Sequence, residues 1–269
     1  MNRRLLLIKQ WLINNYNVSL SELLYVIFSS PSYIKATKHI LKIETGKEYN
    51  VYYFKSIKHP LFIHKSIDYN TMCSVICETL NSTDWHHYIT KNTNINKNDT
   101  VIDCGSAEGL FSLSIYDKCS HVYIIEPLTS FVNSLNKTFF DIPNITILNY
   151  ALSDHEYKTK ISDKGIASSL NNSIGHSINV TTIDNLFYNK NIPVNFIKAD
   201  LEGYDYLTLL GAKNTIKNNL PKISITTYHN KEHIVLITKF LKKCYSGYNI
   251  KTKGLYHSFN CPIMLHAWV

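Results

Sequence analysis

The sequence predicts an α/β fold with a parallel, doubly wound sheet, and three observations lead to this fold class. From residue 100 onward, short apolar runs rich in β-branched residues alternate with segments of helical spacing. Two of these runs end in a carboxylate, at Asp103 and Glu126, with a glycine turn and a helical segment between them. The last two expected strands follow each other without a helix, which indicates an antiparallel addition at one edge of the sheet.

The first 45 residues show the apolar spacing of helices. Apolar clusters at residues 5–13, 20–28 and 34–43 predict three helical segments, with Pro31 between the second and the third and Gly46 after the third. We therefore expect the chain to begin with a helical region outside the main sheet.

Two short strands, at residues 51–54 and 61–64, and a helix at 72–80 come next. A run of Asn, Thr and Lys at 92–99 then changes the character of the sequence and is the best candidate for a domain boundary. The predicted organisation is an N-terminal helical extension with a short hairpin over residues 1–95 and a sheet domain over 96–269.

The sheet domain has a regular order of elements. Strands are expected at residues 100–103, 122–126, 145–150, 196–200, 222–228, 248–252 and 263–269. Helices are expected at residues 108–116, 128–139, 182–188, 204–217 and 232–242. The polar stretch 155–177 interrupts the alternation, as a hairpin or a mobile loop, and its part 165–170 is either a lid over a bound molecule or an inert surface loop.

The unit from Asp103 to Glu126 has the features of a nucleoside site. In parallel sheets, ligands bind outside the carboxyl ends of the strands, where both acids lie. Gly105 and Gly109 allow the backbone to approach a ligand, because a Cβ would block the approach. Glu126 is placed to accept hydrogen bonds from the two hydroxyls of a ribose.

The acid at the head of this loop indicates which nucleoside is bound. Dinucleotide-binding loops read Gly-x-Gly-x-x-Gly and hold a pyrophosphate at a helix N-terminus. Here the loop reads Asp-x-Gly-x-x-x-Gly, and the carboxylate of Asp103 would repel a pyrophosphate. S-adenosylmethionine fits better, since it carries a sulfonium, an ammonium and a ribose but no phosphate.

Several separated motifs occur in a fixed order along the domain. They lie at residues 101–109, 125–127, 149–154, 182–186, 196–203, 210–212 and 221–225, the last followed by Tyr228 and His229. In this order they resemble the FkbM family of S-adenosylmethionine-dependent methyltransferases, over roughly residues 60–269. The resemblance implies a Rossmann-like class I methyltransferase fold, whose sheet has seven mostly parallel strands and an antiparallel C-terminal strand.

Two departures from the family pattern concern the site. The loop contains Ser106, Ala107 and Glu108 where the family usually has Ala-Asn, and Asp205 replaces a glutamate, which leaves the role of Asp205 open. The loop and the resemblance together place the cofactor against Asp103, Gly105, Ser106, Ala107, Gly109, Glu126, Pro127, Ala151, Leu152 and Asp200.

A hydroxyl acceptor would need a base or a metal, because an alcohol is a poor nucleophile at neutral pH. Asp200 ends one expected strand, Glu202 follows it, and His229 ends the next strand, so the three could converge over the cofactor. We expect His229 or Asp200 to act as the base and Glu202 to orient the substrate or the loop. The alternative is that His229 is an ordinary strand-end histidine satisfied by backbone groups.

No metal is expected. Asp200, Glu202 and His229 are all ligand types, but Asp-x-Glu is common at strand ends and no further ligand set is evident. The adjacent His86 and His87, and also His257, have no obvious partner in the sequence. Solvated or packing roles are expected for these histidines.

The sequence leaves three function classes. The resemblance implies methylation of a hydroxyl, on a sugar of a surface glycan or on a secondary metabolite. The net charge of +8 favours anionic partners and keeps a nucleic-acid methyltransferase open, but Lys and Arg are dispersed and no Asn-Pro-Pro-Tyr or Asp-Pro-Pro-Tyr motif occurs. A binding module without catalysis would not need the acids Asp103, Glu126 and Asp200. No nucleic-acid partner is expected.

The expected compartment is the cytoplasm. The six cysteines show neither a disulfide framework nor metal-ligand spacing. The apolar N-terminal run stops at Lys9 without a cleavage site, and no stretch has the length of a membrane span. Basic residues beside that run still allow a peripheral membrane contact through the first helix.

Overall fold

A seven-stranded sheet forms the centre of the protein. The computed structural model describes residues 3–161, 176–256, 258 and 260–269. The strands of the central sheet are β4 (Thr100–Cys104), β5 (His121–Ile125), β6 (Ile145–Leu148), β10 (Phe196–Ala199), β11 (Lys222–Thr226), β12 (Asn249–Lys253) and β13 (Met264–Trp268). Their order is β12-β13-β11-β10-β4-β5-β6. The pairs from β11 to β6 are parallel, and β13 pairs antiparallel with both of its neighbours, as the sequence predicts.

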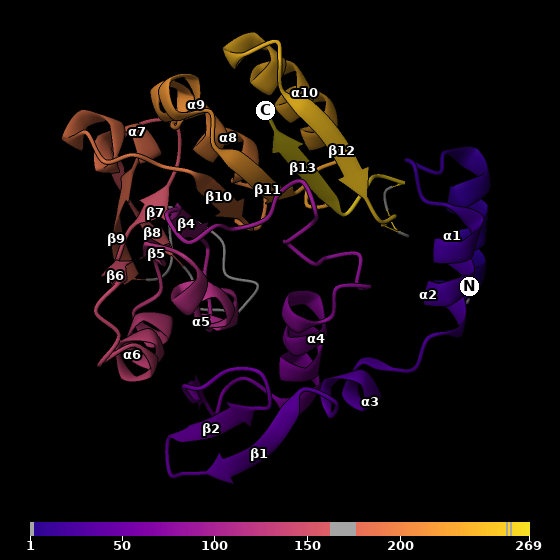
Figure 1. Cartoon of the computed structure of the whole chain (residues 1–269), viewed down its shortest axis with the longest axis horizontal. Helices are drawn as coiled ribbons and strands as arrows, with labels where there is room; N and C mark the ends of the chain where they lie inside the picture. The colour runs from indigo at the N-terminus through magenta and orange to yellow at the C-terminus, as the bar shows by residue number, and fades with distance from the viewer. Residues whose placement is uncertain (1–2, 162–175, 257, 259) are drawn as a thin grey trace.

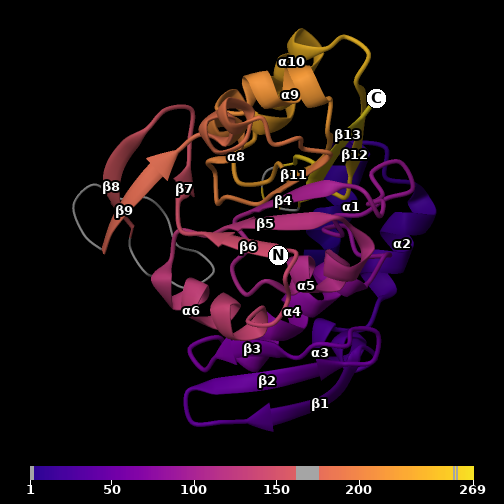
Figure 2. The same cartoon turned by 60° about the vertical axis from the view of Figure 1, so that its left-hand side comes forward.

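Helices cover both faces of this sheet (Figure 2). One face carries α4 (Tyr69–Leu80), α5 (Leu110–Ile115), followed by the 3-10 turn η1 (Tyr116–Lys118), and α6 (Thr129–Thr138). The other face carries α7 (Ile183–Leu186), the 3-10 turn η3 (Tyr188–Lys190), α8 (Asp205–Leu210), α9 (Lys213–Asn219) and α10 (His233–Cys244). All four residues of β10 are buried because its two faces are both covered.

The N-terminal region contains three helices and a small sheet (Figure 1). They are α1 (Arg3–Ile13), α2 (Leu20–Phe28), α3 (Ser32–Ala36), β1 (Ile40–Thr45), β2 (Tyr49–Phe54) and β3 (Leu61–His64). The expected helix over 34–43 is wrong, because α3 ends at Ala36 and residues 40–45 pair antiparallel with β2. Gly46 closes this hairpin by donating its N–H to the carbonyl of Tyr49. Pairing with a partner strand thus outweighs the local helical spacing.

A third sheet lies at the edge of the domain. It consists of β7 (Ala151–Leu152), β9 (His176–Thr181) and β8 (Tyr157–Ile161), in that order. The antiparallel pair of β8 and β9, at the two ends of the polar stretch 155–177, agrees with the hairpin alternative, and residues 162–175 between them lie outside the described residues. The segment 165–170, considered as a lid, and His257 lie outside the described residues.

The predicted helix over 204–217 is two helices, α8 and α9, separated at Gly211. A Cβ on Gly211 would lie only 2.2 Å from the carbonyl oxygen of Ser153. The chain therefore turns where its backbone packs against the β7 segment, and a periodicity count along one helix does not detect this contact.

The hydrophobic core extends across the expected boundary at residue 95. One buried cluster joins Tyr52, Leu61 and Met72 of the N-terminal part to Val101 and Leu110 of the sheet domain. In a separate buried cluster, α1 and α2 pack against the side chains of Trp85 and Leu255. None of the helices in the described part of the chain is long and apolar enough to cross a membrane.

Candidate active site

The loop between β4 and α5 has a backbone conformation that requires glycine at two positions. Gly105 has φ +70°, and a Cβ there would lie 2.1 Å from the carbonyl oxygen of Asp200, so no side chain fits. Gly109 has φ +84°, and a Cβ there would meet the side chain of Leu135. The glycine spacing that marks this loop in the sequence is therefore dictated by its contacts with the end of β10 and with α6.

Lys198 holds the loop from the neighbouring strand. Its Nζ lies 2.9 Å from a carboxylate oxygen of Asp103 and donates to the carbonyl of Gly105 at 2.7 Å. Ser112 donates to the second oxygen of Asp103 at 2.7 Å. Burial lowers the pKa of Lys198, but the charges of Asp103 and Asp200 outweigh this effect and raise it, so the ion pair is maintained at neutral pH.

Glu126 lies at the tip of β5 and faces the loop. Its carboxylate accepts the N–H of Ala107 at 2.9 Å and the N–H of Leu128 at 3.0 Å. Each carboxylate oxygen has a second lone-pair site, so both can accept another donor. Burial raises the pKa of Glu126 to about 7. An added hydroxyl donor would favour its ionised form.

These elements enclose a cavity at the carboxyl ends of the parallel strands. Its empty volume, including space open to solvent, is about 1030 Å³, and we call it the cofactor cavity. Its wall includes eight of the ten residues expected to contact a cofactor: Gly105, Ser106, Ala107, Glu126, Pro127, Ala151, Leu152 and Asp200. The other two, Asp103 and Gly109, lie behind the wall, where they shape and hold the loop.

Acidic side chains dominate the charge of the cofactor cavity. The charged residues in its wall are Glu78, Glu108, Glu126, Asp200, Glu202 and Lys198. Burial raises the pKa of Glu108 to about 7, as it does for Glu126. Five carboxyl groups against one ammonium make this cavity unsuited to a phosphate-rich ligand and suited to a cationic or neutral one.

Asp200, directly after β10, is the most connected residue of the wall. It accepts the hydroxyl hydrogen of Tyr88 at 2.8 Å and that of Thr226 at 3.2 Å. Its carboxylate also lies 3.4 Å from Nε2 of His86 and 3.8 Å from Nε2 of His229. Burial alone would raise the pKa of Asp200, but these cationic neighbours and Lys198 lower it, so the group stays ionised.

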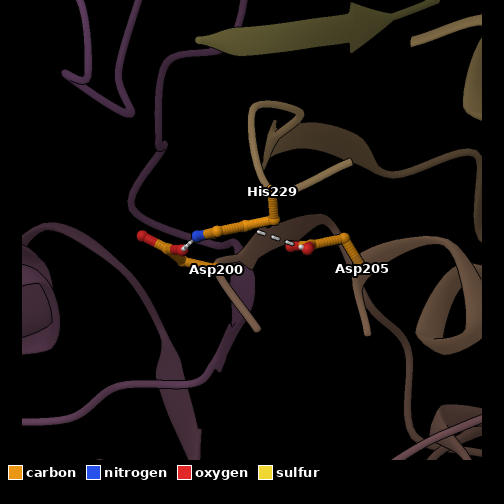
Figure 3. Close-up of side chains that lie close together, drawn as sticks. All are labelled: Asp200, Asp205 and His229. Atoms are coloured by element: carbon orange, nitrogen blue, oxygen red, sulfur yellow. Dashed lines mark ion pairs between the residues drawn. The ribbon is translucent and has the colours of Figure 1, made fainter. Parts of the chain in front are cut away.

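His229 lies between the carboxylate of Asp200, directly after β10, and that of Asp205, at the start of α8 (Figure 3). Its Nε2 faces Asp200 and also lies 3.4 Å from Glu202, while its Nδ1 lies 3.4 Å from Asp205. Burial lowers the pKa of His229, but these carboxylates raise it above the usual imidazole value. The structure brings the three expected catalytic residues together, with Asp200 and Glu202 in the cavity wall and His229 behind them.

Asp205 has a structural role that the sequence left open. Its oxygens accept the N–H groups of Leu201 at 3.1 Å and Gly203 at 3.2 Å and the hydroxyl hydrogen of Thr226 at 3.0 Å. These bonds fix the turn that carries Glu202, whose φ of +50° is strained for a residue with a side chain. The shorter acid at position 205 thus holds the turn and faces His229.

The sequence prediction for His86 was wrong. His86 is buried, and its Nδ1 lies 3.1 Å from Glu78 while its Nε2 faces Asp200. Burial lowers its pKa, but Glu78 and Asp200 raise it to about 9. His86 and Glu78 therefore extend the charged cluster to α4, far from Asp200 in the sequence. Lys198 was missed as well, although a lysine in the middle of an apolar strand requires a buried acid as partner.

Asp200, Asp205 and His229 also offer one ligand atom each within 4.8 Å of one another. Such a set is chemically able to hold a divalent ion. In this structure the two nitrogens of His229 face different carboxylates, and both oxygens of Asp205 already accept backbone N–H groups. The arrangement is that of an imidazole between carboxylates, and the expectation of no metal stays a prediction.

Solved structures share the fold. A methyltransferase FkbM from Methylobacillus flagellatus KT superposes with a TM-score of 0.51 at 16% identity, covering 92% of this chain. This chain spans 60% of the length of that protein. At this identity the likeness shows the fold alone.

Two further matches have lower TM-scores. An rRNA methylase from Streptococcus thermophilus gives 0.40 at 14% identity, over 64% of this chain and 87% of its own. Fibrillarin from Aeropyrum pernix, solved with natively bound S-adenosyl-L-methionine, gives 0.43 at 12% identity, over 86% and 99%. No conclusion about this chain rests on either.

A search of curated protein sequences gave no significant match. A family model described as the methyltransferase FkbM domain, in contrast, matches residues 103–248, more than half of the 269 residues. The match begins at Asp103, the residue that Lys198 holds, and runs through Glu126, Asp200 and His229. The chain belongs to the FkbM family of S-adenosylmethionine-dependent methyltransferases.

Proposed function

We propose that this protein transfers the methyl group of S-adenosylmethionine to a hydroxyl of a sugar in a surface glycan or of a secondary metabolite, in the cytoplasm. One observation carries the proposal: the loop with Glu126 and the acids Asp200 and Glu202 form walls of the same cavity. We take the first wall as a nucleoside site and the second as a proton-accepting site, side by side in one cavity. The six free cysteines agree with a reducing compartment.

The residues present fit the cofactor. Glu126 retains acceptor capacity for two ribose hydroxyls beyond the bonds that it already accepts. The Oγ of Ser106 is buried and has no hydrogen-bond partner among the described residues, so a polar ligand atom would satisfy it. Leu128 and Phe131 add apolar wall for a purine. When bound, S-adenosylmethionine supplies a methyl group on a positively charged sulfur.

The cavity also fits a neutral acceptor. An alcohol oxygen at the wall would donate its hydrogen to Asp200, which stays ionised because of its cationic neighbours. As the O–H bond breaks, the proton passes to Asp200, and from there to His229 when that imidazole is in its neutral form, while Glu202 orients the acceptor or the turn. A substrate rich in phosphates would meet five acids in this wall, so a nucleic-acid acceptor is disfavoured despite the net charge of +8.

Calorimetry with S-adenosylhomocysteine and NAD tests the cofactor. We expect micromolar-range binding of S-adenosylhomocysteine and none of NAD. Tight binding of NAD without a response to S-adenosylhomocysteine would overturn the proposal.

Incubation with S-adenosylmethionine carrying a labelled methyl group tests the acceptor. Glycan extracts should take up the label, and total RNA should not. Label on RNA, together with retention of RNA on filters, would support a nucleic-acid methyltransferase. Cofactor binding without label on any extract would support a binding module.

A further inference from the structure

A second cavity lies beside the cofactor cavity, and we call it the N-terminal cavity. Its empty volume, including space open to solvent, is about 1730 Å³. Its wall is built by α1, the segment from α2 to α3, α4, residues 83–86 and the chain near Tyr228 and Tyr256. Figure 1 shows α1 and α2 on one side of this region and α4 on another. Of its wall residues, Tyr228 alone falls within the part of the chain that matches the family model.

The two cavities share one wall. Glu78 lines both of them. His86 lines the N-terminal cavity, and its Nε2 lies 3.4 Å from Asp200, which lines the cofactor cavity. A molecule in the N-terminal cavity is therefore separated from the acids of the cofactor cavity by a single layer of ion-paired side chains.

The wall of the N-terminal cavity combines aromatic rings with hydroxyl groups. The rings belong to Tyr25, Trp85, Tyr228 and Tyr256, and the serine and threonine hydroxyls to Ser29, Ser30, Ser32, Ser74 and Thr83. Leu7, Val26, Ile27, Pro31, Leu255 and Ile263 add apolar wall between them. A sugar ring has an apolar C–H face and a rim of hydroxyls, so it can pack on an aromatic face and hydrogen-bond at its edge. This mixture suits a hydroxyl-rich ligand better than a hydrocarbon chain.

The charges in the wall balance. Arg4 and Lys35 are opposed by Glu78 and Asp84, and the charge on His86 is paired with Asp200. The net charge of +8 of the chain is thus not concentrated in this cavity. A polyanion such as RNA needs an excess of Lys and Arg along its path. The balance favours a neutral ligand.

We infer that the N-terminal cavity binds a neutral oligosaccharide, and that it holds the part of the acceptor remote from the methylated hydroxyl. Only this second role rests on the proposed methylation of hydroxyls. Binding of the oligosaccharide follows from the wall itself.

The three tryptophans of the chain provide a direct test. Trp85 lines the cavity, whereas Trp11 and Trp268 do not. In the ¹⁵N-labelled full chain with S-adenosylhomocysteine, neutral oligosaccharides of two to four sugars should shift the indole N–H signal of Trp85, assigned from the spectrum of Trp85→Phe. The signals of Trp11 and Trp268 should stay in place.

A matched pair of variants locates the binding. Tyr25 lines the cavity and is half-exposed, so Tyr25→Ala should leave the fold intact and weaken binding about three- to tenfold, the scale of one aromatic contact. Tyr188→Ala removes a similarly exposed ring that lies in neither cavity and should leave the affinity unchanged.

Each outcome decides between the two proposals. A Trp85 shift without methyl transfer to any sugar upholds the cavity and refutes the sugar acceptor. Methyl transfer to a monosaccharide, with no Trp85 shift from any oligosaccharide, refutes the cavity and upholds the acceptor. A Trp85 shift caused by single-stranded RNA and not by sugars overturns the inference, as does an unchanged affinity in Tyr25→Ala.

Discussion

The two walls of the cofactor cavity are built in different ways. The wall around the loop from Gly105 to Gly109 is made of backbone and short side chains, and its glycines are required by contacts of 2.1 and 2.4 Å that a Cβ would make. The wall around Asp200 is made of charged side chains from α4, β10 and the turn after β10, with His229 behind it. A short sequence motif determines the geometry of the first wall, whereas the second wall forms only when several segments of the chain pack together.

We expect this difference to separate cofactor binding from catalysis. Changes in the loop wall should alter cofactor affinity, and changes in the Asp200 wall should alter turnover. Single substitutions in each wall show whether one can be changed without the other.

The largest effect is expected from His229→Ala. Turnover should fall by about two to four orders of magnitude, the usual contribution of a positioned base. The affinity for S-adenosylhomocysteine should change little, because His229 lies behind the cavity wall. Labelled methyl transfer and calorimetry measure the two quantities. His64→Ala, at an exposed histidine of β3 that contacts Ser66, is the control and should keep full turnover.

Asp200→Asn decides which group is the base. If this variant loses turnover while His229→Ala retains most of it, the proton goes to Asp200. Near-normal turnover in both variants would contradict the assignment of either residue and direct attention to Glu202.

Lys198→Met should lower the free energy of unfolding by about 3–5 kcal/mol, because it leaves Asp103 buried without its partner. The loop should also loosen, since Gly105 loses a donor. Urea denaturation measures the loss. Lys222→Met breaks the more exposed pair with Asp99 and should cost about 1 kcal/mol at most. Equal losses in the two variants would show that burial of the Lys198 pair does not matter.

Glu126→Ala should weaken cofactor binding by about 1.5–3 kcal/mol, the scale of a charge-assisted hydrogen bond. Calorimetry with S-adenosylhomocysteine measures this, and circular dichroism checks the fold. Asp154→Ala, at an acid outside the wall, should have no effect. An unchanged affinity in folded Glu126→Ala would show that Glu126 does not bind the ribose.

The smallest effect is a pH dependence of cofactor affinity. The pKa of Glu126 is raised to about 7 by burial. Ribose hydroxyls bind the ionised form, so a proton must leave before binding, and affinity should be full above pH 7 and fall below it. The limiting slope is about tenfold per pH unit. Glu126→Gln should flatten the profile between about pH 5.5 and 7.5, and an unchanged profile would assign the titration to another group, with Glu108 as the first candidate.

Most of the fold could be predicted from the sequence. The alternation of strands and helices after residue 100 and the antiparallel last strand are confirmed, because their signals are local and periodic. Residues 40–45 were mispredicted because their structure is set by pairing with β2. The break at Gly211 was missed for a similar reason, since its cause is the carbonyl of Ser153.

The two walls of the cofactor cavity also differ in how far they could be predicted from the sequence. The loop and Glu126 could be identified from one stretch of sequence. Glu78 and His86 could not, because they acquire their role only when α4 packs beside the sheet, and spacing along the chain carries no information about that contact. Lys198 lies within the motif at residues 196–203, but its pairing with Asp103 depends on the register of β4 and β10.

The contact from Lys198 to Gly105 has a consequence for the order of folding. It spans 93 residues of sequence, so the early loop is held by a strand that is synthesised much later. Contacts of such long range form late, after the entropy of closing a large loop has been overcome. The nucleoside site is therefore completed only when β10 has docked. A bound nucleoside should accordingly slow hydrogen exchange in β10 as well as in the loop, since both belong to one cooperative unit.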